Sequence, residues 1–158
     1  LSFKQPQELK GFKNVQTIVA IINTSPDKYN VLELEAAIRN NPRINFVIVS
    51  RQIVVPKCVN VVHIDRFISD QELYYLYFEF DHFLVTTNTN RPSGIFGRTM
   101  QFNKFAIILE NSYNQTLNYP NSIVISNLHE INRIDFSNTP TKFDCSKFND
   151  SSVLLNKF

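Results

Sequence analysis

The sequence of 158 residues is poor in glycine and cysteine and has no tryptophan. Its three glycines are few for a nucleotide-binding domain, because glycine lets the backbone approach a phosphate group closely. Two cysteines, Cys58 and Cys145, are too few for a disulfide framework, and we expect both to be reduced. The three histidines are scattered, and no zinc-type cluster, P-loop or G-x-S-x-G motif occurs. We therefore expect no metal site.

An excess of charge of one sign and long apolar runs are also lacking. Sixteen basic and fourteen acidic residues give a formal net charge of +2, which argues against a dedicated nucleic-acid-binding protein, since such proteins carry a basic stripe. No apolar run is long enough for a transmembrane helix, which needs about 18 residues or more. We expect a cytoplasmic protein, with a peripheral membrane position as the alternative for the full-length protein.

The chain does have enough apolar residues for one well-packed domain. It is 43% hydrophobic, and a domain of this length buries about two-thirds of the surface that its unfolded chain exposes. We expect residues 1–14 to form a lead-in or linker and residues 15–158 to form the domain. Because the first residue is Leu1 rather than methionine, we expect the chain to be part of a longer protein or a processed product.

Short apolar segments alternate with helical patterns along the chain. The first segment, "VQTIVAII", is a continuous run rich in β-branched residues, typical of a strand that is covered on both faces. After it, Val31, Leu34 and Ile38 follow helical spacing. Strands are expected at 15–22, 44–50, 59–65, 81–87, 105–110 and 121–126. This alternation predicts an α/β fold, a Rossmann-like three-layer sandwich with a mainly parallel sheet of about six strands.

Helix boundaries can be placed from capping residues. Ser69 and Glu72 form a capping-box pattern, so a helix is expected to begin there. Its aromatic residues, between Tyr74 and Phe80, are expected to pack on the sheet rather than to bind sugar. His63, inside an apolar strand, is expected to have a structural role. Further helices are expected at 98–104, after Asn127 and at 144–156.

The ligand site of such a sheet lies beyond the carboxyl ends of the strands, where the strand order reverses. The candidate loops are 23–28, 65–69, 86–98 and 110–120. Ser93 and Gly94 offer backbone amides just before a helix, which favours anions, although a plain turn is the alternative. Arg91 and Arg98 flank this segment and could bind a diphosphate, or lie on the solvated surface.

The order of these segments resembles the C-terminal, donor-binding half of GT-B glycosyltransferases of the glycogen-synthase-like type. The stretch "NVVHIDRFISDQELYYLYFEFDHFLVTTN" is similar to the family's strand, helix and strand, and "SGIFGRTMQFNKFAIILENS" is similar to its later glutamate-containing segment. The residues of the first stretch that match the pattern are Val61, His63, Phe67, Ser69, Leu73, Tyr77 and Asp81. The resemblance spans about residues 15 to 134.

This resemblance implies a retaining, metal-independent glycosyltransferase of the hexosyltransferase type, with a nucleotide-sugar donor as substrate and no cofactor. The glycan or lipid acceptor would be held by an N-terminal half outside this chain, so we expect no sugar transfer by this chain alone, and its catalytic residues stay unknown. Lys28 stands near a family lysine that contacts the donor diphosphate, although a solvated loop lysine is the alternative. The residues expected to bind the donor are Asn23, Thr24, Lys28, Arg91, Ser93, Gly94 and Arg98.

The sequence also departs from the family pattern. The two family glutamates fall at Arg91 and Thr99, and the glycine and arginine after the first strand are replaced by Asn23 and Thr24. An alternative is therefore a non-catalytic, GT-B-like binding or scaffolding domain that has lost the donor chemistry.

Overall fold

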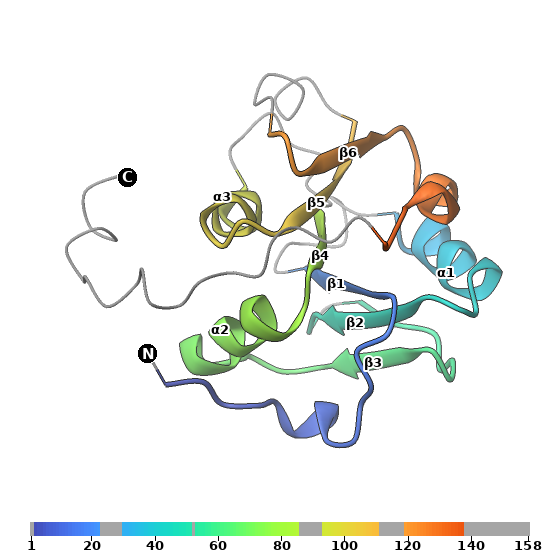
Figure 1. Ribbon diagram of the computed structural model, residues 1–158. Coiled ribbons are helices and arrows are strands. Elements are labelled where there is room, and N and C mark those ends of the chain that lie inside the picture. Colours follow the sequence, from blue (N-terminus) through green and yellow to red (C-terminus); the bar gives the residue numbers. More distant parts are fainter. Residues whose placement is uncertain (1, 23–29, 52, 86–92, 111–118, 138–158) are drawn as a thin grey trace.

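The computed structural model describes residues 2–22, 30–51, 53–85, 93–110 and 119–137. They form a six-stranded sheet of order β3-β2-β1-β4-β5-β6 (Figure 1). All five strand pairings are parallel, which confirms the expected Rossmann-like α/β fold. The strands are β1 (Thr17–Ile21), β2 (Asn45–Val49), β3 (Val61–Ile64), β4 (His82–Val85), β5 (Phe105–Leu109) and β6 (Ser122–Ile125).

Strand β1 is buried on both faces, as its continuous apolar run predicts. Ile18 and Ala20 contribute to the hydrophobic cluster on one face of the sheet, and Val19 and Ile21 to the cluster on the other. The strand begins at Thr17 rather than at Val15, because Gln16 has a φ of 44° and interrupts the extended backbone. The alternation of side chains along β1 thus supplies two cores.

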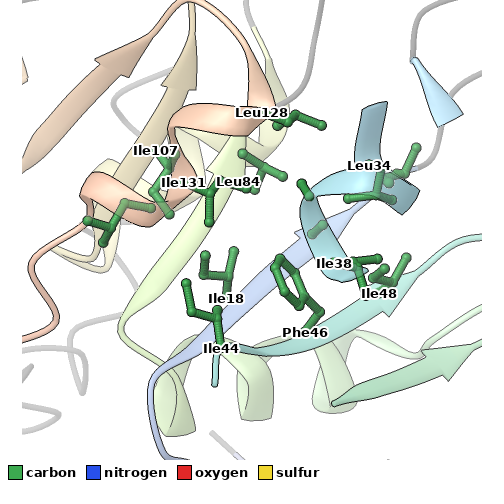
Figure 2. Packing of buried hydrophobic residues seen from close by; sticks show 14 of the residues in the cluster. Ile18, Leu34, Ile38, Ile44, Phe46, Ile48, Leu84, Ile107, Leu128 and Ile131 are labelled. Carbon is green, nitrogen blue, oxygen red and sulfur yellow. The ribbon is translucent and has the colours of Figure 1, made fainter. Parts of the chain in front are cut away.

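Helix α1 (Val31–Asn40) and the 3-10 helix η4 (Leu128–Arg133) cover the first face of the sheet. Each begins at an asparagine: the side chain of Asn30 accepts a hydrogen bond from the amide of Glu33, and that of Asn127 accepts one from the amide of His129. Side chains of the two helices converge on those of the sheet (Figure 2). The labelled residues of this cluster are Ile18, Leu34, Ile38, Ile44, Phe46, Ile48, Leu84, Ile107, Leu128 and Ile131.

Helix α2 (Asp70–Glu79) covers the opposite face and begins with the expected capping box of Ser69 and Glu72. The ring of Tyr77 is fully buried and stacks between Phe83 and Phe102, with centroid distances of 4.4 and 5.0 Å. Stacked aromatic pairs add to the stability that burial gives. The aromatic residues of this helix therefore serve largely as core, as expected.

Helix α3 (Gly94–Gln101) lies on the same face as α2 and begins earlier than the sequence suggested. Arg98 was expected to open this helix, but Ser93 caps it, since its Oγ accepts a hydrogen bond from the amide of Phe96. Phe96 then packs on β4 and β5 through Val85 and Ala106. The expected helix at 144–156 lies outside the described residues.

The residues before β1 lie along α2 and β3, with the short 3-10 helix η1 (Gln7–Leu9) at their centre (Figure 1). Leu9 is buried in the same cluster as α2. Phe12 contacts the ring of Phe80 edge to face, and the side-chain amide of Asn14 donates to the carbonyl of Glu79. We refer to residues 2–14 as the lead-in segment; it brings Glu8 to the third strand.

Candidate functional site

A cleft of about 330 Å³ lies at the carboxyl edge of the sheet. Its volume falls in the range of small-molecule sites, which begin at about 300 Å³. The wall is built from the ends of β1, β2 and β3 and from the helices α2 and α3. Its polar and charged lining residues are Ser50, Arg51, Arg66, Asp70 and Arg98, and the ring of Phe67 lines it too.

The strand order explains why the cleft forms here. Strands β1 and β4 are neighbours at the centre of the sheet, and the chain proceeds from them toward opposite edges. After β1 it continues to α1 on the first face, and after β4 to α3 on the second. Connections that leave in opposite directions open a crevice between them, which is where ligands bind in sheets of this kind.

Arg98 is the one residue of the predicted donor site that the structure places in the wall of the cleft. It lies half-buried in the last turn of α3, close to the phenol of Tyr77. Burial raises the pKa of Tyr77 to about 12, against smaller opposing effects of a hydrogen bond with Thr99 and of the Arg98 charge. Within the described part of the chain, no ion pair includes Arg98. Its guanidinium is therefore available to an anion.

Arg51 supplies a second guanidinium, directly after Ser50 at the end of β2. Its central carbon lies 3.4 Å from the centroid of the Phe67 ring, in a cation–π contact. Phe67 itself is 74% exposed, which is unusual for so large an apolar side chain. A guanidinium over a ring can still donate hydrogen bonds from its edge to an anion. Among the described residues Arg51 forms no ion pair either.

Arg66 is different, because its guanidinium is already saturated. Glu8 accepts from Nε and Nη2 at 2.8 and 2.9 Å, and Glu72 accepts from Nη1 and Nη2 at 3.1 and 2.7 Å. The carbonyl of Phe67 accepts from Nη1 at 3.1 Å. A guanidinium has five N–H donors, so none is left over. Its hydrogen bonds hold the pKa of Glu72 at about 2 and lower that of Glu8.

The other predicted site residues differ in their placement. The Ser93 hydroxyl caps α3, and Gly94 is the first residue of that helix. An added Cβ at Gly94 would meet nothing within 4 Å, so the described structure does not require glycine there. Asn23, Thr24, Lys28 and Arg91 lie outside the described residues.

Sequence reasoning did not single out Arg51 or Arg66. Arg66 falls in the candidate loop 65–69, and Arg51 is the second residue after the buried strand "NFVIV". A charged residue shortly after a buried parallel strand was the available signal, since such residues meet at the carboxyl edge. His63, expected to be structural, donates from Nε2 to the carbonyl of Ser50 at 2.8 Å. This bond holds the backbone directly before Arg51.

Thr99 occupies the position where the family resemblance places a glutamate. It is fully buried, and its hydroxyl donates to the carbonyl of Ile95 at 2.8 Å, one turn earlier in the same helix. A threonine that bonds in this way satisfies its own polar group within the helix. Its side chain therefore offers no carboxylate to the cleft.

The described residues also lack two further features. No group of three or more His, Cys, Asp or Glu in this part of the chain is arranged to hold a metal ion. None of the helices that the structure describes is both long and apolar enough to cross a membrane. Comparison with protein-family models gave no match, and comparison with curated proteins gave none either.

Proposed function

We propose that this domain binds the nucleoside diphosphate part of a nucleotide-sugar donor and is the donor-binding unit of a retaining, metal-independent glycosyltransferase. The observation that carries the proposal is the pair of arginines in the cleft at the switch in strand order. Arg51 follows β2 and Arg98 belongs to α3, yet both line one cleft.

A diphosphate is the ligand chemistry that this pair fits best. Each arginine can donate two parallel hydrogen bonds to a phosphate group, and each such charge-assisted contact contributes about 1.5–3 kcal/mol. Asp70 also lines the cleft and would accept hydrogen bonds from hydroxyl or amino groups of the same ligand. The mixed set of two cations, one carboxylate and one exposed ring favours a nucleotide over inorganic phosphate.

The transferase part of the proposal rests on the family resemblance and not on the cleft alone. Arg98 belongs to "SGIFGR", which is part of the stretch that resembles the family's glutamate-containing segment. The glycan or lipid acceptor would be bound by a separate half of the protein that closes over the donor, because transfer requires both substrates in one geometry. We assign no catalytic residue in this chain.

A second function, a non-catalytic binding or scaffolding domain, is favoured by Thr99. Its buried hydroxyl is satisfied within α3, at a position where the resemblance expects a carboxylate. A domain that kept the fold without the donor chemistry would tolerate this exchange. The two functions differ in whether the cleft binds a nucleoside diphosphate.

Calorimetry with uridine, guanosine and adenosine diphosphate tests the proposal. We expect one of the three to bind selectively, and Arg98→Ala to weaken that binding by about 10- to 150-fold, since one charge-assisted phosphate contact is lost. Arg43→Ala is the matched control, because Arg43 is exposed and precedes β2 at the opposite edge of the sheet. Equal affinity of wild type and Arg98→Ala would place the phosphates elsewhere. No binding by the wild type would leave the scaffolding function as the better proposal.

A further inference from the structure

We propose that Glu8, Arg66 and Glu72 form a positioning unit that fixes one wall of the cleft, and that through Glu8 the lead-in segment sets the affinity for nucleotide. The proposal rests on the proposed function for its ligand, but its structural part can be tested without one. In this unit Arg66 acts through other residues, not by contact with the ligand.

The saturation of Arg66 excludes a direct role in binding. All five of its N–H donors have partners within the protein, at 2.7–3.1 Å. An anion could bind Arg66 only by displacing a carboxylate that is already paired in bidentate fashion. Two carboxylates around one guanidinium also give this unit a net negative charge, which would repel a diphosphate.

Hydrogen bonds of Arg66 and Glu72 also hold the backbone of the cleft wall. Arg66 holds the carbonyl of Phe67, and Glu72 accepts from the amide of Ser69 at 2.9 Å. The chain between Arg66 and Glu72 is therefore tied at both ends and in its middle. Phe67, Ile68 and Asp70, which line the cleft, lie within this tied stretch.

Glu8 reaches this unit because the lead-in segment is anchored independently of it. Leu9 is buried beside it, and the ring of Phe3 stacks on that of Phe78 with centroids 5.0 Å apart. The amide of Lys4 donates to the carbonyl of Gln71. The side chain of Glu8 is thus delivered to Arg66 by a segment with contacts of its own, so a shift of that segment would move the wall.

The direction in which one substitution changes nucleotide affinity distinguishes a positioning role of Glu8 from a purely electrostatic one. Glu8→Gln removes a negative charge near a cleft that is proposed to bind an anion, so electrostatics alone predicts tighter binding. The amide also replaces one of the two acceptors for Arg66 with a donor, which frees Nε or Nη2 and loosens the wall. Positioning therefore predicts weaker binding, despite the more favourable charge.

The experiment combines amide exchange with calorimetry on Glu8→Gln. We expect exchange of the Ser69 amide to accelerate about five-fold, the effect of weakening one hydrogen bond in its support, and the NMR signal of Arg66 Nε–H to shift and broaden. Affinity for the best-binding diphosphate of the three should fall about three- to ten-fold. Arg66→Lys keeps the charge but loses the planar fork, and should give the same acceleration of Ser69 exchange and the same loss of affinity. Glu35→Gln, which breaks an exposed ion pair with Arg39 on α1, is the matched control and should change neither.

Unchanged exchange at Ser69 in both Glu8→Gln and Arg66→Lys would overturn the positioning unit, whether or not any nucleotide binds. Accelerated exchange together with tighter binding by Glu8→Gln would show that Glu8 acts by its charge, and would overturn the coupling to affinity. If the wild type binds no diphosphate, the proposed function fails, while the exchange rates still decide whether the lead-in segment holds the wall.

Discussion

Each edge of the sheet has a pocket, but the two edges differ in whether their charged and polar side chains have partners within the described residues. At the amino edge a hollow of about 570 Å³ is larger than the 330 Å³ cleft at the carboxyl edge. Its residues include one cation and one anion, Arg43 and Asp135, among uncharged side chains. The cleft instead contains two arginines without an ion pair in the described part of the chain.

Polar side chains at the amino edge form hydrogen bonds with backbone carbonyls or ion pairs with one another. The side-chain amide of the buried Asn60 donates to the carbonyls of Ile38, Asn41 and Ile44. Lys104 is almost completely buried and pairs with Asp81 at 2.9 Å. These contacts fix the turns from which the strands start. These polar groups at the amino edge are thus paired within the protein, whereas Arg51 and Arg98 at the carboxyl edge form no ion pair among the described residues.

Breaking the buried ion pair should have the largest effect, and only on stability. Asp81→Asn leaves the Lys104 ammonium buried without a counter-charge, which we expect to lower the free energy of unfolding by about 2 kcal/mol. The value is below that of a fully buried pair because the Asp81 side chain is 36% exposed. Urea unfolding measures it.

Nucleotide affinity of the folded Asp81→Asn protein should equal that of the wild type, because the pair lies at the amino edge. Glu35→Gln, in the exposed pair on α1, is the control and should change stability far less. A large loss of affinity in Asp81→Asn would mean that the two edges are not independent.

Removing the Arg51 side chain should lower nucleotide affinity and leave stability almost unchanged. Arg51→Ala is expected to weaken nucleotide binding about ten-fold, because one cation is lost from the cleft, and to change the free energy of unfolding by less than about 0.5 kcal/mol, because the residue is exposed. Calorimetry and urea unfolding of the same preparation measure both quantities. A protein that unfolds much more easily, with unchanged affinity, would assign Arg51 to structure.

Lowering the pH should destabilise the two edges at different pH values, and these changes in the free energy of unfolding should be the smallest of the expected effects. His82 is buried near the amino edge, its Nε2 has no hydrogen-bond partner among the described residues, and burial lowers its pKa below 6.5. A depressed histidine pKa means that the unfolded state binds the proton more readily, so its contribution is present above about pH 6.5 and is lost as pH falls below that value. At the carboxyl edge, hydrogen bonds with Arg66 depress the pKa of Glu72 from 4.5 to about 2, so its contribution is lost only as pH falls from about 4.5 toward 2.

Urea unfolding at several pH values should therefore show two steps in stability. His82→Phe should remove the step that begins below about pH 6.5 and leave the lower one, whereas Glu72→Gln should reduce only the lower one. A single step that both substitutions alter would contradict separate titration of the two edges.

Much of the fold followed from sequence because its signals are local. The β-branched run of β1 and the capping box at Ser69 depend on neighbouring residues, and both predicted the observed elements. The start of α3 was misplaced because a glycine-containing segment has weak helix propensity, and the cap by Ser93 overrides it. The saturation of Arg66 could not be foreseen, since its partner Glu8 is distant in sequence and is brought to it only by the folding of the lead-in segment.

The candidate site was predicted less completely than the fold. The carboxyl edge was the expected location, and Arg98 lies in the cleft there. Which arginines have free donors depends on contacts between distant segments, and no local pattern distinguishes Arg51 from Arg66. Net charge had the same limitation, because a total of +2 does not show that Arg51 and Arg98 line one cleft without an ion pair among the described residues.

We propose that the carboxyl edge of the sheet binds a nucleoside diphosphate through Arg51 and Arg98. An NMR titration that follows backbone amides and arginine Nε–H groups tests it most directly, with uridine, guanosine and adenosine diphosphate added in turn. We expect saturable shifts at Arg51, Phe67 and Arg98 with one of the three, and none at Arg43 or Asn60. Shifts confined to the amino edge, or no shift with any of the three at millimolar concentration, would contradict it.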